Sequence, residues 1–139
     1  MANYMPAWRS NYFAVKDRDA FMAWIARFRG EVEVQFKRYG PRELATILQS
    51  QTSQSGIPTS CVDPETGEAV ACDFTAELAQ HLAEPDVAIL QEVGHEQLRY
   101  LVGMAVAVRA DGRVLQVGIT DIYQLVDEEW NVIPTEAVD

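Results

Sequence analysis

The sequence has few of the groups from which enzymes most often build a site. It contains two histidines and two cysteines among its 139 residues. No Gly-x-Gly-x-x-Gly loop, Gly-x-x-x-x-Gly-Lys-Ser/Thr loop or Gly-x-Ser-x-Gly elbow is present. These absences disfavour nucleotide binding and serine-hydrolase chemistry. They predict a protein that is not an enzyme and needs no cofactor.

The chain also lacks a long hydrophobic run. Its most apolar segment, 98–108, is shorter than the roughly 18–20 residues that a membrane-spanning helix needs. The first residues show no basic region followed by an apolar run, so we expect no secretory signal. Two cysteines do not form a disulfide framework, and in a reducing cytosol they would remain thiols. We therefore expect a cytoplasmic protein that makes no membrane contact.

Basic residues are nearly absent from the last two thirds of the chain. Residues 1–42 carry eight Lys/Arg against four Asp/Glu, whereas residues 43–139 carry three against seventeen, and the net charge is −10. Direct binding to nucleic acid is disfavoured, because it requires a net positive footprint. The basic segment 37–42, with Tyr39 as a stacking face, could grip a phosphate or simply be a polar loop.

Metal-binding and nucleophilic arrangements are poorly supported. Cys61, Cys72, His81 and His95 form a Cys₂His₂ set, but their spacing lacks the close ligand pairs of zinc sites, so we expect no metal. His95 lies in the segment 93–97, which we expect to form an exposed β-turn.

The hydrophobic pattern predicts one α+β domain spanning 1–139, a two-layer structure in which helices cover one face of a mostly antiparallel sheet. The expected order is β-α-β-hairpin-α-β-β-β-α. Asp17 or Asp19 begins the first helix, which has an apolar stripe and Arg27 and Arg29 in its last turn. In the first half we expect a strand at 12–15, a helix up to Gly30, a strand at 31–36 parallel to the first, a segment 44–48 of undecided type and a polar loop at 49–60. In the second half we expect hairpin arms at 61–62 and 69–72, a helix after Asp73, strands at 87–93, 98–108 and 114–119, and a helix that begins at Thr120 or Asp121.

The turn Asp111-Gly112 predicts a two-residue hairpin between the last two strands. That register places Val106 and Val108 on one face with Leu115 and Val117. Gly103, Ala105 and Ala107 then make the opposite face small, which suits a closely packed helix.

Acidic residues cluster at turns and helix ends, where they could imitate a row of phosphates to a protein that binds nucleic acid. A charge of this size also serves solubility alone. The candidate partner-binding residues are Asp63, Glu65, Glu68, Asp73, Glu77, Asp127, Glu128 and Glu129.

Two segments, 10–17 (SNYFAVKD) and 98–108 (LRYLVGMAVAV), resemble small acidic proteins carried by phages and conjugative elements. The resemblance covers 19 of 139 residues and brings no catalytic motif with it. It implies a bacterial host cell and a role like that of anti-CRISPR or anti-restriction inhibitors. Pure nucleic-acid mimics are acidic throughout, so the mixed sign of this chain favours a binder with one acidic face.

The leading hypothesis is therefore a non-enzymatic inhibitor that docks on a basic, nucleic-acid-binding surface of a host defence complex. The alternative is a small ligand-binding domain or enzyme whose site lies near the loop 49–60 and uses His81, Cys61 or Cys72. A third possibility is an accessory protein of plasmid or phage maintenance whose charge serves only solubility.

Overall fold

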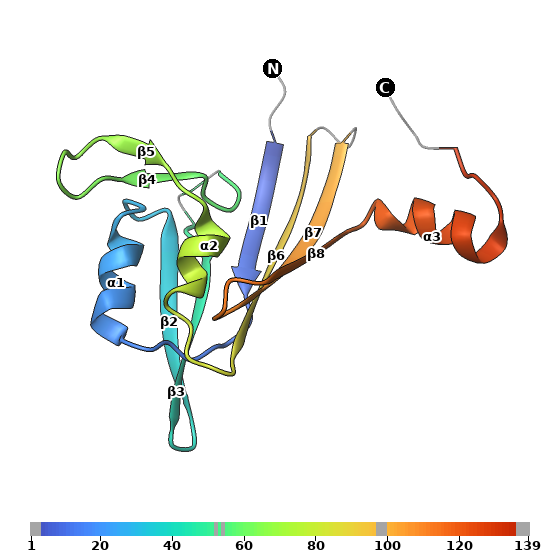
Figure 1. Cartoon of the computed structure of the whole chain (residues 1–139). Coiled ribbons are helices and arrows are strands. Elements are labelled where there is room, and N and C mark those ends of the chain that lie inside the picture. The colour runs from blue at the N-terminus through green and yellow to red at the C-terminus, as the bar shows by residue number, and fades with distance from the viewer. Residues whose placement is uncertain (1–3, 52, 54, 97–99, 136–139) are drawn as a thin grey trace.

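The fold is built on a six-stranded antiparallel sheet with the strand order β2-β3-β1-β6-β7-β8, beside a two-stranded hairpin β4–β5 (Figure 1). The structure is a computed structural model, and it describes residues 4–51, 53, 55–96 and 100–135. The elements are β1 (Tyr4–Ser10), α1 (Arg18–Ala26), β2 (Val32–Tyr39), β3 (Arg42–Gln49), β4 (Ser60–Val62), β5 (Ala69–Ala71), α2 (Phe74–Ala79), β6 (Val87–Glu96), β7 (Tyr100–Arg109), β8 (Val114–Gly118) and α3 (Asp121–Trp130). The predicted α+β class is confirmed.

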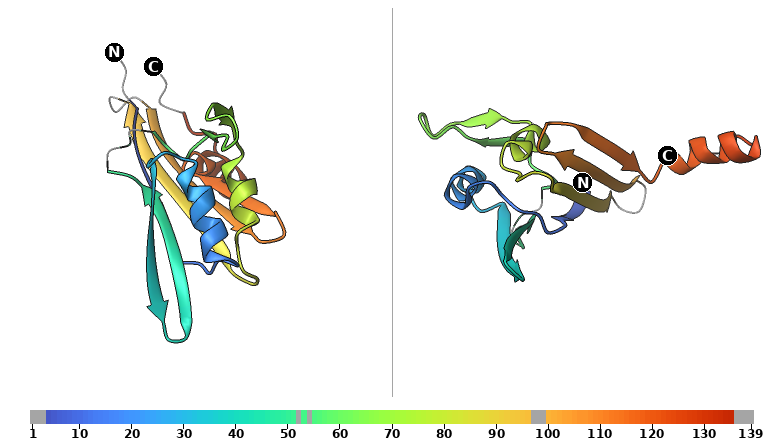
Figure 2. Two further views of the ribbon diagram at one scale, coloured as in Figure 1. Left: turned by 90° about the vertical axis from the view of Figure 1, so that its left-hand side faces the viewer. Right: turned by 60° about the horizontal axis from the view of Figure 1, so that its bottom comes forward.

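The core lies between α1, α2 and the face of the sheet that they cover (Figures 1 and 2). The predicted apolar stripe is buried: Phe21, Trp24 and Ile25 lie on α1, and Phe28 follows just after the helix ends. Asp17 caps this helix by accepting a hydrogen bond from the N–H of Ala20 at 3.1 Å. Leu90 of β6 and Val108 of β7 meet the helices from the sheet and are fully buried.

The first strand was predicted in the wrong place. β1 covers Tyr4–Ser10, whereas 12–15 makes only isolated bridges from Phe13 to Ala45 and from Val15 to Leu82. Pro6 is tolerated in β1 because most of this strand pairs along one edge only. The undecided segment 44–48 belongs to β3, which lies between β1 and β2, so these two strands run parallel without pairing.

The register of the β7–β8 hairpin was also predicted wrongly. Arg109 donates its N–H to Arg113 O, so the loop between these residues has three members rather than two. Gly112 at φ 90° ends that loop, as in hairpins with a bulge. One extra residue in the turn moves every side chain of β8 to the other face. Ala105 therefore pairs with Val117, and Ala107 pairs with Leu115.

Two smaller expectations were wrong as well. α1 ends at Ala26, and Arg29 follows in the left-handed region at φ 51°, so Arg27 and Arg29 lie beyond the last turn. His95 lies within β6 rather than in a turn, opposite Met5 and Leu101. The predicted β6 and β7 are otherwise confirmed, and residues 98 and 99 of the expected strand lie outside the described part of the chain.

The last helix differs from the other two. α3 begins at Asp121 as predicted, but none of its residues is buried. Figures 1 and 2 show it extending away from the edge of the sheet that β8 forms. The layer of helices that covers the sheet therefore consists of α1 and α2 alone among the described elements.

Candidate functional site

The tip of the β4–β5 hairpin carries three of the predicted acidic residues. Asp63 accepts a hydrogen bond from the N–H of Glu65 at 2.9 Å, which shapes the turn, and Gly67 at φ 73° completes it. Glu65 and Glu68 are exposed. The guanidinium of Arg29 donates to Gly67 O at 2.8 Å and is a basic neighbour of the tip. The hairpin projects from the body beside α1 (Figure 1), so the tip presents carboxylates to solvent.

The two acidic candidates near α2 serve the fold. Asp73 caps this helix by accepting a bond from the N–H of Ala76 at 3.2 Å. Glu77 accepts a bond from Trp24 Nε1 at 2.9 Å and lies 4.0 Å from Arg27. Their carboxylates are therefore engaged within the molecule.

The remaining three candidates, Asp127, Glu128 and Glu129, are exposed on α3. Gln124 donates to Glu128 at 2.7 Å, one turn along the helix. Figure 1 places α3 at the opposite side of the molecule from the β4–β5 hairpin. The eight acidic candidates therefore form three separate groups rather than one face.

The basic segment 37–42 forms the tip of the β2–β3 hairpin, and part of its charge is neutralised. Arg42 contacts Asp86 at 2.7 Å. Burial would raise the pKa of Asp86, but the bonds from Arg42 and from the N–H of Ala14 outweigh it and hold the pKa below its usual value. Lys37 lies over the ring of Tyr39 at 5.3 Å.

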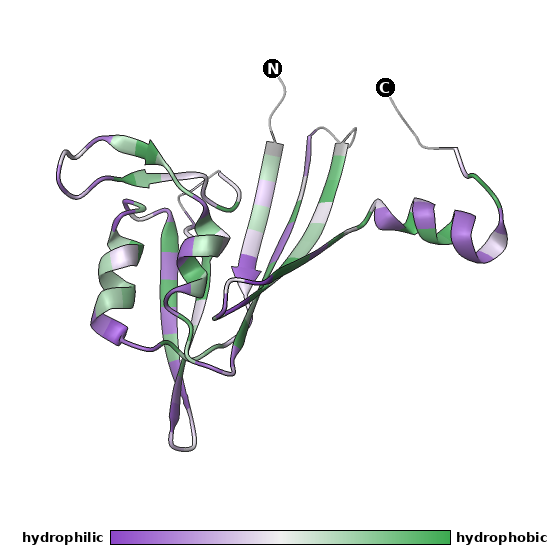
Figure 3. Ribbon diagram, in the orientation of Figure 1, coloured by the Kyte–Doolittle hydropathy of each residue, from purple (hydrophilic) through white to green (hydrophobic). Residues whose placement is uncertain are grey.

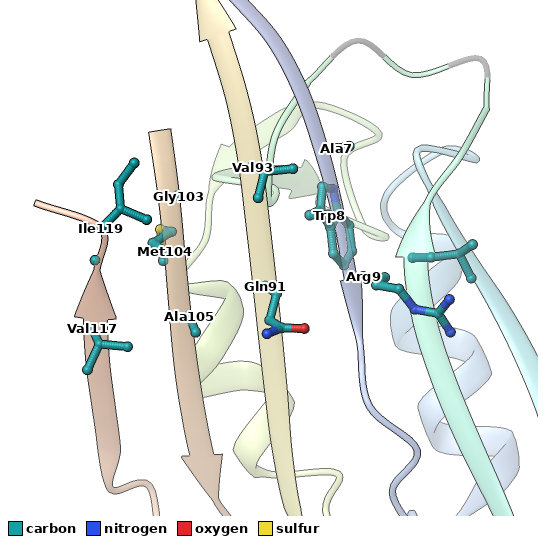
Figure 4. Close-up of a pocket in the computed structure, with 12 residues that line it drawn as sticks. Ala7, Trp8, Arg9, Gln91, Val93, Gly103, Met104, Ala105, Val117 and Ile119 are labelled. Atoms are coloured by element: carbon teal, nitrogen blue, oxygen red, sulfur yellow. The ribbon is translucent and has the colours of Figure 1, made fainter. Parts of the chain in front are cut away.

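None of the described helices covers the face of the sheet opposite α1 and α2, here called the bare face, and sequence reasoning missed it. A groove of about 670 Å³ runs across this face (Figure 4). It is lined by Ala7, Trp8, Arg9, Leu48, Gln91, Val93, Gly103, Met104, Ala105, Val117, Gly118 and Ile119. Arg9 is the one charged residue among these described lining residues. The small residues of β7 predicted a helix on this face, and that signal could have pointed to the groove.

Gly103 marks where the groove approaches the start of α3. A Cβ added there would lie 2.7 Å from Cγ2 of Ile119, so the glycine lets Ile119 lie against β7. The N–H of Ile119 donates to Gly103 O at 2.8 Å, which continues the strand pairing for one residue beyond β8. The groove is therefore closed at this end by the segment that leads into α3.

A second hollow, of about 500 Å³, lies where the loop 49–60 ends. Residues 57–59 line it together with Cys72, Glu92 and Met104. Neither histidine lines this hollow. His81 instead stacks on Trp24, with ring centroids 5.1 Å apart, and lines a different hollow beside Glu77. Burial and the charge of Lys16 lower the pKa of His81.

The two thiols lie together on β4 and just after β5. The ligand atoms of Cys61, Cys72 and Glu77 all lie within 4.8 Å of one another, so this trio could approach a metal ion. Burial, with the neighbouring Cys61 and Glu77, raises the pKa of Cys72 to about 12. A thiol of that pKa is protonated at neutral pH, while the Glu77 carboxylate already accepts a bond from Trp24. The trio therefore fits one buried and one half-buried thiol beside a hydrogen-bonded carboxylate better than it fits a metal centre.

Among the residues that the structure describes, no helix has the length and apolar character needed to cross a membrane. Comparison with known proteins found no matching family model, no matching curated protein and no matching solved structure.

Proposed function

We propose that the chain is a non-enzymatic binding protein that docks the acidic tip of its β4–β5 hairpin on a basic, nucleic-acid-binding surface of a partner protein. In the bacterial setting that the resemblance implies, such a partner would be a host defence nuclease. The protein would then act as an inhibitor of the anti-CRISPR or anti-restriction kind, by occupying a surface that nucleic acid otherwise contacts.

One observation carries this proposal: the hairpin tip projects from the body and bears three carboxylates within the six residues 63–68. Glu65 and Glu68 are exposed, so docking would not first have to break bonds of the fold. The basic tip of β2–β3 lies at another end of the molecule (Figure 1). A partner with a positive surface would therefore meet the acidic tip in a preferred orientation.

The test is retention of partners on the immobilised protein, with identification by mass spectrometry. We expect a nucleic-acid-binding protein to be retained at about 0.1 M salt and released as salt or competing duplex DNA is raised. A triple variant, Asp63→Asn/Glu65→Gln/Glu68→Gln, removes the charge of the tip and keeps the oxygen of residue 63 that accepts from residue 65. Since each exposed pair contributes about 0.2–1 kcal/mol, the affinity should fall roughly 3- to 150-fold.

A matched control removes the same number of charges from α3, as Asp127→Asn/Glu128→Gln/Glu129→Gln. If the tip is the contact, this control binds nearly as well as the unmodified protein. Equal losses in both triple variants would assign the effect to overall charge and overturn docking by the hairpin. A partner held without change at high salt would overturn the electrostatic mechanism.

The hollow of about 500 Å³ at residues 57–59 favours a second candidate, binding of a small ligand. Thr59 is exposed at its rim, so Thr59→Trp should fill the opening without disturbing the core. A metabolite that raises the melting temperature of the unmodified protein but not of Thr59→Trp would support this candidate. A metabolite screen without any such shift would remove it.

A further inference from the structure

The bare face of the sheet exposes large apolar side chains. Val93 of β6 is 59% exposed, and on β8 Leu115 is 77% and Val117 is 61% exposed. Figure 3 shows apolar residues along β8, and Figure 4 shows Val93 and Val117 in the groove. Contiguous exposed apolar surface of this kind usually marks an interaction site in a folded protein.

α3 exposes a matching apolar stripe. Ile122 is 55%, Leu125 is 50% and Trp130 is 73% exposed, and with Val126 they follow the i, i+3, i+4, i+8 spacing of one helix side. Figure 3 shows apolar and polar residues alternating along this helix. A ten-residue helix with no buried residue is marginal in water, so α3 needs a surface to cover it.

We propose that the occupant of the groove is a second copy of this chain, with α3 of each copy lying across the bare sheet face of the other. Such an exchange is a two-fold symmetric arrangement, in which the same patch is used on both copies and the contact closes on itself. It covers both apolar surfaces at once. It goes beyond the proposed function and leaves the β4–β5 tip free.

The dimensions agree. Ten helical residues are about 15 Å long, and the groove crosses from Leu48 of β3 to β8, four strand spacings or about 19 Å, so α3 fits within its length. Ala105 is small, so a helix can approach β7 closely at this position.

The charges agree as well. Arg9 is the charged group in the groove, and the last turns of α3 carry Asp127, Glu128 and Glu129. A helix that brings carboxylates toward Arg9 would gain a favourable contact at the rim. Apart from Arg9 and Gln91, the side chains that line the groove are apolar, as is the α3 stripe.

The link before α3 favours a second copy over the chain's own groove. α3 begins three residues after the last residue of β8, and the link is held by two bonds. The N–H of Ile119 donates to Gly103 O at 2.8 Å, and the N–H of Gly118 donates to Asp121 at 2.7 Å. These bonds direct the helix away from its own sheet (Figure 2). Folding back would have to break them.

The experiment is the mass of the full chain in solution by light scattering during gel filtration, over a range of concentrations. We expect a mass twice the 15.6 kDa of the chain. Val117→Lys in the groove and Leu125→Glu in α3 should each give a monomer with an unchanged circular dichroism spectrum, because both positions are exposed in the single copy. Matched controls, Gln116→Lys on the other face of β8 and Gln124→Glu on the polar side of α3, should remain dimeric.

Mixing the two disrupted variants sharpens the test. A mixed dimer has two contacts between α3 and a groove, and one of them is unmodified. The other places the new carboxylate on α3 of one copy beside the new ammonium group in the groove of the other copy. We expect the mixture to form dimers that neither variant forms alone. A dimer that persists in Leu125→Glu would mean direct sheet-to-sheet packing and overturn the exchange. A monomeric wild type at every soluble concentration would mean that α3 covers its own sheet or meets a different partner, and would also overturn it.

Salt separates this proposal from the proposed function. Raising salt screens the rim contact of Arg9, but it also screens the repulsion between two chains of net charge −10, so the apolar dimer should persist. Docking of the acidic tip on a basic partner should weaken under the same conditions. A dimer that dissociates as salt rises would contradict apolar exchange, whatever becomes of partner binding.

Discussion

The two faces of the central sheet are both apolar, yet one is covered and the other is bare. On the covered face, Val106 and Val108 of β7 are 3% and 0% exposed beneath the helices. On the bare face, Leu115 and Val117 of β8 lie largely in solvent beside the small Ala105. Apolar sequence alone therefore does not distinguish a core from an interface, because the difference lies in which face has a helix packed on it.

This comparison divides the physical roles of the two faces. Burial of apolar area on the covered side stabilises the fold of a single copy. The bare side contributes little until something covers it, so it is available for association. Substitutions should therefore affect unfolding on one face and association on the other.

The largest effect is expected from Phe21→Ala on the covered side. Phe21 is fully buried, and its ring centroid lies 6.1 Å from that of Phe13 and 6.0 Å from that of Trp24. Its truncation should lower the free energy of unfolding by about 3–5 kcal/mol. Leu115→Ala on the bare face should change that free energy by less than about 0.5 kcal/mol. Urea denaturation of both, in the Leu125→Glu background, keeps association out of the measurement.

If Leu115→Ala lowered the free energy of unfolding by several kcal/mol in that background, the comparison between the two faces would fail. It would mean that α3 or another segment of the same copy covers the bare face in solution. A small cost at Phe21 would show instead that the helices do not form the core.

Much of the fold could be predicted from the sequence because it depends on local patterns. The stripe of α1, the cap at Asp73 and the alternation in β2 each lie within one element. These signals gave the class and most elements correctly. The first strand was misplaced because β1 is defined by its pairing with β6, which is distant in the sequence and leaves no local pattern.

The site was harder to predict. One extra loop residue at the β7–β8 turn exchanged the faces of Leu115 and Val117, and turn composition alone does not fix loop length. The amphipathic pattern of α3 predicted a helix but not which surface covers it. The acidic residues were easy to find, but their separation into three groups follows from tertiary structure.

A smaller effect is expected from the polar seam between β1 and β3. The buried hydroxyl of Thr46 donates to Ser10 O at 2.9 Å, and the two hydroxyls lie 3.2 Å apart. Thr46→Val keeps the shape but removes the donor, and should lower the free energy of unfolding by about 1–3 kcal/mol. Gln91→Leu on the bare face removes an exposed polar group, so it should leave unfolding of the monomeric background nearly unchanged.

Chemical denaturation of the double variant Ser10→Ala/Thr46→Val completes a cycle. We expect the double variant to lose less than the sum of the two single variants, since the hydroxyls act as one unit. Additive losses would show that the two hydroxyls contribute independently and that the seam is not a shared network.

The smallest effect concerns pH on the covered side. Burial and Lys16 lower the pKa of His81 from 6.5, so the folded protein holds this ring neutral more strongly than the unfolded chain does. Below about pH 6.5 the unfolded chain binds more protons, and the free energy of unfolding falls as pH is lowered. The contribution of His81 to the free energy of unfolding is complete above that pH and is lost progressively below it.

His81→Gln, measured by urea denaturation from about pH 8 to pH 5, should show a shallower decline in the free energy of unfolding than the unmodified protein. Lys16→Gln keeps the ring but removes the nearby charge, so it should give an intermediate decline. Identical profiles for all three proteins would mean that the ring titrates freely in the folded state and is not held against Trp24.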